Sequence, residues 1–199
     1  YIINGLMQGE SSSNVYYLAN HAVAAHVADA QDKAIWRQGV IKGLAMINDD
    51  MAQFPVMALG AATWALATTG PLDTTSVDPT AEEGSQWFGV VLSDLPGILL
   101  SHQVPSGGFD EGSFFWRFDH GDAGLEVVTE GYTEDAIFGA LGLWAALKAS
   151  DPIEPVVVDL EEGVLAASVA ILSNLKDDGV VCEHLSIVDG AQDRLVYAS

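Results

Sequence analysis

Residues 54–67 read FPVMALGAATWALA and contain no charged residue. Ala and Gly fill most of the positions between the large apolar residues, which are Val56, Met57, Leu59, Trp64 and Leu66. Because nearly every face of a helix over this stretch is apolar, we expect the helix to be buried. A wholly buried helix is typical of a fold that has inner and outer helices.

Apolar segments with helical spacing recur on both sides of this stretch. Helices are predicted over these ranges: 12–27, 32–47, 54–67, 87–92, 94–102, 133–149 and 159–175. The helix over 32–47 is amphipathic, with these apolar residues on one stripe: Trp36, Val40, Leu44 and Ile47. Residues 68–83 are predicted to form a loop without a core-forming pattern, and residues 104–130 a long loop. The tail, residues 180–199, has a mixed pattern that indicates short strand or turn structure.

Helix-capping residues mark several of these starts. Ser11, Ser12, Ser13 and Asn14 are all candidate N-caps of the first helix. Asp94 is a candidate N-cap that places Pro96 in a first turn, where proline is tolerated. Asp159 and Glu162 approximate a capping box, which predicts that the last helix starts at Asp159.

Two parts of the sequence correspond to each other. Trp64-Ala65 aligns with Trp144-Ala145, and each helix is followed by a second helix and a Gly-containing turn. The repeating unit is therefore interpreted as a helical hairpin, and the chain holds about three of them, over 12–50, 54–103 and 132–176. We expect a single all-α domain over residues 1–199, arranged as part of an α/α barrel or toroid. The alternative is a generic similarity between Ala-rich helices.

The charge balance excludes several classes of function. The chain has 199 residues and a net charge of −21, with 28 Asp and Glu against 7 Lys and Arg. Such a chain has no basic patch for phosphates, so binding to nucleic acid or to an anionic membrane is not expected. No apolar run approaches the ~20 residues that span a bilayer. Cys182 is the single cysteine, so no intramolecular disulfide is expected. Because the sequence opens at Tyr1 without Met, we interpret it as a processed or trimmed polypeptide.

Residues 99–109 read LLSHQVPSGGF and contain the pattern Q-x-x-x-G-G-F. Gly107 and Gly108 permit a turn with left-handed backbone, and Gln103 can satisfy free backbone groups at a helix end. Phe109 is expected to anchor the loop in the core. This pattern resembles the repeat of the protein prenyltransferase β-subunit and squalene cyclase superfamily, which implies an α/α-toroid.

The overall arrangement is also similar to secreted toroid-repeat proteins of the planctomycete type, many of which have no assigned activity. Three stretches carry this second resemblance: 60–70, 93–97 and 113–116. The resemblance implies an extracellular or cell-surface location. Three hairpins are too few to close a toroid of this family. Either further chain or neighbouring copies would then complete the ring.

The catalytic motifs of this superfamily are incomplete here. Squalene cyclases protonate their substrate with an Asp of a D-x-D-D motif, of which Asn48-Asp49-Asp50 lacks the first acid. Prenyltransferase β-subunits bind zinc through Asp, Cys and His. Cys182 and His184 are close in sequence, but Val180 stands where the Asp would be. A cyclase, a prenyltransferase or a zinc site is therefore not favoured.

Two acid–histidine pairs follow the Gly-containing turns, Asp119-His120 and Glu183-His184. With Glu134 and Asp135 they are candidates for a polar mouth that would cleave a sugar or hold a metal. The alternative is loop hydrogen bonding and helix capping. Oxygen ligands for calcium are available at Asp119, Asp122, Asp177 and Asp178, although no EF-hand loop is present.

Aromatic residues near this mouth suggest a sugar or a partner chain as ligand. The candidate ligand-binding residues are Phe115, Trp116, Tyr132, Glu134 and Asp135, and the neighbouring Phe114 and Phe118 belong to the same aromatic cluster. Packing in the core is the alternative for these rings.

Three functions follow from these observations. The first is a non-catalytic extracellular structural or interaction protein that self-associates, with calcium as a candidate cofactor. The second is a toroid enzyme acting on a polysaccharide or an isoprenoid by carboxylate acid catalysis. The third is a glycan-binding module.

Overall fold

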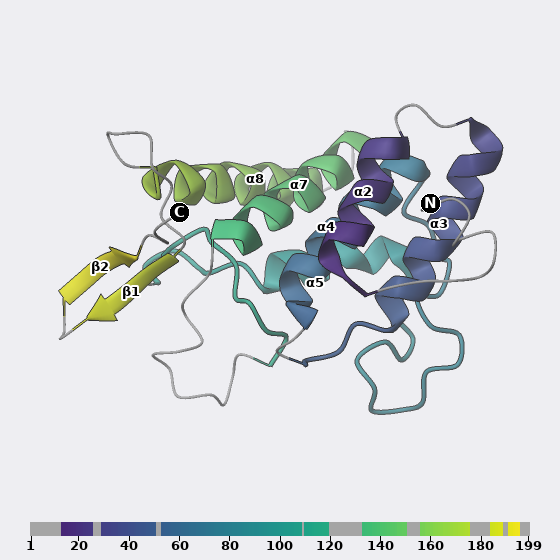
Figure 1. Cartoon of the computed structure of the whole chain (residues 1–199), viewed down its shortest axis with the longest axis horizontal. Helices are drawn as coiled ribbons and strands as arrows, with labels where there is room; N and C mark the ends of the chain where they lie inside the picture. Colours follow the sequence, from purple (N-terminus) through teal and green to yellow (C-terminus); the bar gives the residue numbers. More distant parts are fainter. Residues whose placement is uncertain are drawn as a thin grey trace.

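The computed structural model describes residues 13–25, 29–50, 53–108, 110–119, 133–150, 156–175, 184–188 and 191–195. These residues are mostly helical, as the sequence predicts (Figure 1). The α-helices are α2 (Val15–Ala25), α3 (Ala30–Ala45), α4 (Pro55–Thr69), α5 (Leu95–Ser101), α7 (Thr133–Ala149) and α8 (Val156–Ser173), and η2 (Leu92–Asp94) is a short 3-10 helix. Near the C-terminus, β1 (His184–Val188) and β2 (Ala191–Leu195) form an antiparallel hairpin in which His184 lies opposite Leu195. Within this described part, no helix is long and apolar enough to cross a membrane.

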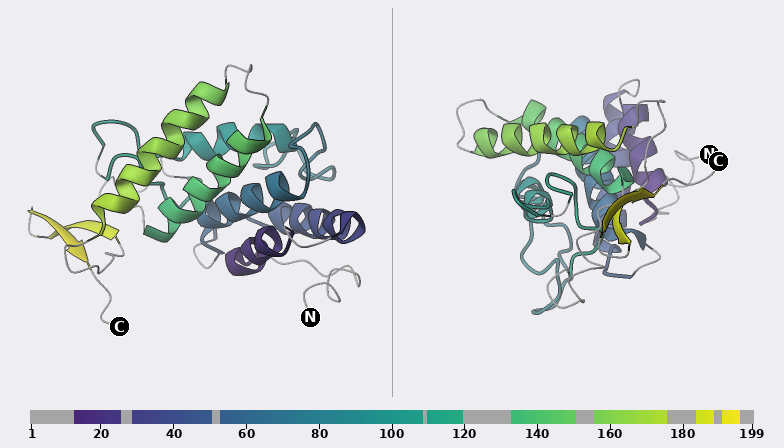
Figure 2. Two further views of the ribbon diagram at one scale, coloured as in Figure 1. Left: turned by 90° about the horizontal axis from the view of Figure 1, so that it is seen from above. Right: turned by 90° about the vertical axis from the view of Figure 1, so that its left-hand side faces the viewer.

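Helix α4 lies at the centre of the helical array. It contacts α2, α3, α5 and α7, and α7 in turn contacts α8. Residues 55–63 are all buried, and so are Ala65 and Leu66, as predicted from the apolar sequence. The view from above shows α7 between α4 and α8, with α8 at the outer edge (Figure 2). The apolar stripe of α3 is buried as well, since Val40 and Leu44 are fully buried.

The α4–α7 crossing is set by glycines. A Cβ added at Gly60 would lie 2.5 Å from the carbonyl oxygen of Phe138, and one added at Gly142 would lie 2.8 Å from the carbonyl oxygen of Gly60. A Cβ at Gly139 would lie 2.4 Å from the ring of Phe114. The two backbones therefore meet with no side chain between them, which brings the neighbouring apolar residues into close packing.

The predicted starts of α2, α3 and α8 are each displaced by two or three residues, whereas those of α4, α5 and α7 are found within one residue. The Asn14 side chain accepts a hydrogen bond from the Tyr17 amide at 3.2 Å, as expected of an N-cap of α2. Helix α8 starts at Val156 and not at Asp159, so Asp159 lies in its first turn and does not cap it. An acid at this position still interacts favourably with the positive end of the helix dipole.

The connection between α4 and α5 differs from the prediction. The helix expected over 87–92 is absent, and turns precede η2. The loop also contributes to the core, because Val77 is 1% exposed and Trp87 is 5% exposed. The Trp87 indole donates to the carbonyl of Ile47 at 2.9 Å, a long-range contact that local sequence periodicity does not encode. The Asp94 carboxylate accepts from the Val91 amide at 3.0 Å and makes no cap bond to α5.

The glycine crossing yields a stability prediction. Gly60→Ala is expected to lower the free energy of unfolding by about 1–3 kcal/mol, because its methyl group would overlap the backbone of α7. Gly97→Ala in α5 is the matched control, since a Cβ there meets nothing within 4 Å. The control is expected to be neutral or to stabilise by about 0.4–1 kcal/mol. Urea denaturation of both variants checks this, and equal effects of the two would contradict it.

Candidate functional site

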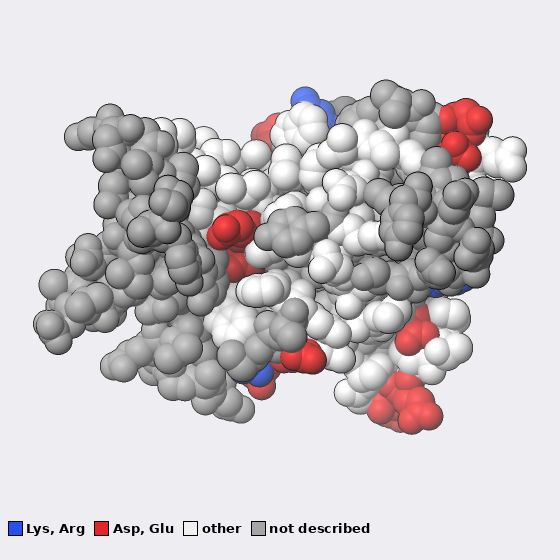
Figure 3. Space-filling model, viewed as in Figure 1, with Lys and Arg blue, Asp and Glu red and all other residues white. Residues whose placement is uncertain are grey.

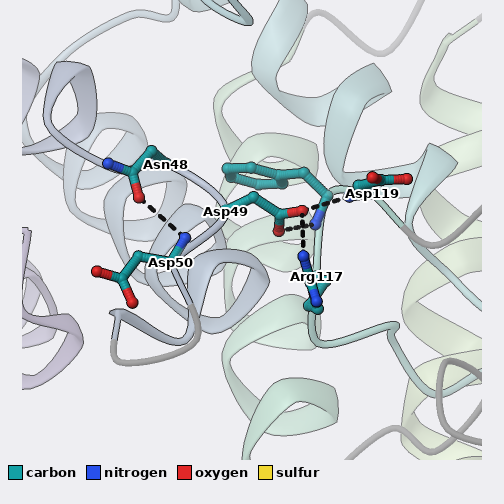
Figure 4. A network of polar contacts seen from close by, with 6 residues as sticks. Asn48, Asp49, Asp50, Arg117 and Asp119 are labelled. Atoms are coloured by element: carbon teal, nitrogen blue, oxygen red, sulfur yellow. Dashed lines mark hydrogen bonds and ion pairs between the residues drawn. The ribbon is translucent and has the colours of Figure 1, made fainter. Parts of the chain in front are cut away.

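The Asp49 carboxylate joins the turn after α3 to residues 117–119 (Figure 4). Oδ1 accepts from the Phe118 amide at 3.0 Å, and Oδ2 accepts from the Asp119 amide at 3.1 Å. Oδ2 also forms an ion pair with Arg117 at 3.1 Å. The turn itself is held by the Asn48 side chain, whose Oδ1 accepts from the Asp50 amide at 2.9 Å. Asp49, which belongs to the incomplete cyclase motif of the sequence, therefore holds a loop in place.

Aromatic rings pack behind this carboxylate. The Phe118 ring lies edge-on to Trp87, with ring centroids 5.9 Å apart, and edge-on to His102 at 5.4 Å. The Gln86 side chain and the Trp87 indole both donate to the carbonyl of Ile47. The 116–119 segment is thus fixed from two sides, by hydrogen bonds and by ring contacts.

The aromatic residues proposed for sugar stacking are largely packed. Phe114 is fully buried, and Phe115 and Trp116 are each 9% exposed. The Arg117 guanidinium lies 5.5 Å from the centre of the Trp116 ring, a cation–π contact within the protein. These rings offer little free face to a sugar, and glycan binding by them stays a prediction. Tyr132 lies outside the described residues.

The Q-x-x-x-G-G-F loop is held by its own side chains. Gln103 Nε2 donates to the carbonyl oxygens of Gly112 at 2.9 Å and of Gly163 in α8 at 2.8 Å. Gly107 has φ 81°, a left-handed conformation that glycine adopts without strain, and its amide donates to the Glu111 carboxylate at 2.8 Å. This backbone bond, together with the Ser106 hydroxyl, lowers the pKa of Glu111. Gly108 is exposed, and Phe109 lies outside the described residues.

An open groove of about 640 Å³ lies between this loop and α8. Its acidic lining residues are Glu111, Asp159 and Glu162, and the Gln103 side chain also borders it. Among the residues that the structure describes, no group of three or more His, Cys, Asp or Glu is arranged to hold a metal ion. Calcium binding is therefore still only a prediction.

The acids at the start of α7 do not share one environment. Glu134 is exposed, whereas Asp135 is completely buried. The Thr133 hydroxyl oxygen accepts a hydrogen bond from the side-chain Nδ2 of Asn174 at 3.2 Å, which links the start of α7 to the end of α8. Of these two acids only Glu134 is exposed, and the polar mouth that includes both stays a prediction.

The acid–histidine pairs are described only in part. Asp119 is exposed, and its backbone amide is engaged by Asp49. His184 begins β1, and nothing is described of its side chain. The remaining proposed catalytic or metal residues lie outside the described residues: His120, Asp122, Asp177, Asp178, Cys182 and Glu183.

The surface has two neighbouring hollows that the sequence pattern does not predict. They lie between the end of α3 and the 76–87 loop and have volumes of about 590 and 550 Å³. Both are lined by Met46, Asp78 and Thr80. In the sequence the loop residues form a polar segment between two helices. Their approach to α3 depends on tertiary contacts, which that pattern does not predict.

A buried histidine lies between α2 and α3. His21 is 1% exposed, and its Nδ1 donates to the Tyr17 carbonyl at 2.6 Å, which leaves Nε2 as the unprotonated nitrogen. In the described structure, neither this Nε2 nor the Trp36 indole nitrogen has a hydrogen-bond partner. The two rings are 6.3 Å apart and nearly perpendicular. Burial lowers the pKa of His21, and the hydrogen bond to Tyr17 opposes that effect.

Comparison of the chain with protein-family models, curated proteins and solved structures finds no match.

The Asp49 contacts predict a difference between two acids of this region. Asp49→Asn is expected to lower the free energy of unfolding by about 1–3 kcal/mol, because an amide group would face N–H donors and the ion pair to Arg117 would be lost. Asp119→Asn is the control and is expected to have little effect, since this exposed residue contributes its backbone amide. Thermal denaturation of both variants tests this; a loss at Asp119 as large as at Asp49 would contradict it.

His21 predicts a pH dependence of stability. Its pKa in the folded protein lies below the unfolded value of 6.5, so the unfolded chain takes up the proton first as the pH falls. The free energy of unfolding is therefore expected to decrease as the pH falls below 6.5, and to be unaffected by His21 above that value. Urea titrations between about pH 7.5 and 5.5 measure this window. His21→Leu should flatten the slope, and an unchanged slope would contradict the assignment.

Proposed function

We propose that this protein is a non-catalytic structural or interaction protein that self-associates through the outer face of α8. The observation that carries the proposal is a row of exposed apolar side chains on this helix. Val158 and Val169 are each 57% exposed, and Leu165 and Leu172 are each 66% exposed. The spacing of these residues places them on one face, opposite the side of α8 that packs on α7.

Hydrophobic burial supplies the driving force for such association. Complete burial of a Val or Leu side chain stabilises by about 1.5–3 kcal/mol. Covering the four half-exposed side chains of α8 would therefore add substantially to the free energy of association. Exposed apolar groups arranged contiguously mark contact surfaces. The net charge of −21 opposes contact between copies through their charged surfaces, so the uncharged apolar row on α8 is the face where association costs least. On the face drawn in Figure 3, the described acidic side chains gather in separate patches on a largely uncharged surface.

The contacts of two acids favour a structural role for them over catalysis. Asp49 is engaged by three donors, and Glu111 accepts from the Gly107 amide of its own loop. An acid that is engaged in loop structure is poorly placed to exchange a proton with a substrate.

The toroid resemblance fits the same proposal. A row of helices in which α4, α7 and α8 follow one another has an outermost helix, and a further helical hairpin or another copy would cover it. We propose that the chain is part of such an arc and, as the resemblance implies, works at the cell surface or outside the cell.

The molar mass in solution tests the proposed function. We expect light scattering to give a mass above the 21.0 kDa of one chain, and Leu165→Glu to weaken the association about tenfold or more. Val23→Glu is the matched control, because Val23 is 58% exposed on α2, away from α8, and its replacement should leave the mass unchanged. The same measurement with added calcium tests whether this cation joins the acidic surfaces. A monomer at every concentration would contradict the proposal.

A further inference from the structure

We propose that α2 opens from α3 and α4 as a separate unit, and that a proton taken up by Nε2 of His21 favours the open state. This inference does not depend on the proposed self-association. It rests on a buried ring nitrogen without a partner and on the kinds of contact that hold α2 and α3 in place. The contact of α2 is then sensitive to mild acid, in the range where histidine titrates.

The hydrogen bond of His21 defines which ring nitrogen is free. A carbonyl oxygen only accepts, so the 2.6 Å contact with the Tyr17 carbonyl puts the proton of the neutral ring on Nδ1. Nε2 is then an acceptor, and it has no hydrogen-bond partner in the described structure. The Trp36 indole of α3, whose ring centre lies 6.3 Å from that of His21, only donates and offers no acceptor to a protonated Nε2. A second ring proton would therefore be buried without a partner.

The charges of the helices around His21 give an imidazolium little support. Helix α4 contains no charged residue, and the other titratable residues of α2 are Tyr16 and Tyr17. The charged residues of α3 are Asp32, Lys33, Arg37 and Lys42, and Asp29 caps this helix. None of these charges contributes to the pKa of His21, which burial lowers and the bond to the Tyr17 carbonyl raises.

The groups that interact with the His21 ring from one turn away lie on α2 itself. The Tyr17 carbonyl accepts from Nδ1, and the Tyr17 ring centre lies 4.9 Å from that of His21. Both move with His21 when α2 opens, so their interactions with an imidazolium do not hold α2 in place. Opening brings Nε2 into water, which removes the cost of burying the charged ring. Protonation therefore favours the open state.

Helices α2 and α3 are held by different kinds of contact. The buried hydrophobic residues of α2 are Val15, Leu18, Ala19 and Ala22. In α3, Arg37 donates to the carbonyl oxygens of Leu66 and Pro71 at the end of α4, and after α3 the Ile47 carbonyl accepts from Trp87. These long-range hydrogen bonds keep α3 in place when α2 opens, and the glycine crossing keeps α4 on α7. Proteins commonly open in such local units.

Hydrogen exchange of the protein, followed by mass spectrometry of peptides from α2, α4 and α7, tests the inference. Protection is measured between about pH 7.5 and 5.0, and each rate is corrected for the intrinsic pH dependence of amide exchange. One linked proton raises the opening equilibrium constant of α2 by at most about tenfold per pH unit. We expect the protection of α2 to fall by about three- to tenfold per unit below pH 6.5, while α4 and α7 keep theirs.

His21→Phe is the test variant, because it keeps a buried ring that does not titrate. The protection of α2 should then no longer depend on pH. His102→Phe is the matched control, since His102 is also buried but follows α5, and its replacement should leave the pH dependence of α2 intact. NMR of the imidazole nitrogens of the unchanged protein gives a second measurement that does not depend on the folding of a variant. The imidazolium of His21 should appear together with the loss of α2 protection.

Three results would overturn the inference. Equal loss of protection in α2, α4 and α7 would show that the whole fold opens, and the proposed self-association would stand. A pH dependence of α2 that persists in His21→Phe would assign the effect to another group. Unchanged protection of α2 while His21 becomes protonated would show that the closed structure accommodates the charge.

Discussion

The close approach of two backbones at Gly60 and Gly142 is the constraint on which the other packing depends. Because no side chain separates α4 from α7 there, the buried residues of both helices meet directly. Gly139 of α7 has no side chain, so the ring of Phe114 packs directly on the helix backbone there. Phe114 begins the segment that leads to Asp119. The Asp49 carboxylate then fixes the end of this segment against the turn after α3. Helix packing and loop geometry are therefore one connected arrangement.

The sequence predicts the helices well where the pattern is local. The apolar run of α4 and the helix over Thr133–Ala149 are found as expected, because periodicity and local capping determine them. The loop after α4 is predicted less well. Trp87 is buried and its indole donates to the carbonyl of Ile47, which is distant in sequence, so no local pattern predicts this contact. The toroid arrangement itself stays a prediction.

Candidate site residues are harder to predict than helices, since a carboxylate can serve structure or chemistry. Asp49 belongs to an incomplete cyclase motif in the sequence, and in the structure its carboxylate accepts from three donors. Asp135, next to the exposed Glu134, is buried. Residue type and spacing identify acids that matter, whereas their partners come from segments far away in the chain. The apolar row on α8 is different, because it is visible in the sequence but its exposure depends on which helix is outermost.

Gln103 couples two parts of the chain that would otherwise open separately. One side-chain amide donates to Gly112 in the loop and to Gly163 in α8. Breaking either bond leaves a carbonyl without this donor, so fluctuations of the loop and of the helix are energetically linked. We therefore expect the loop and the middle of α8 to open less independently in hydrogen exchange than two elements without such a link.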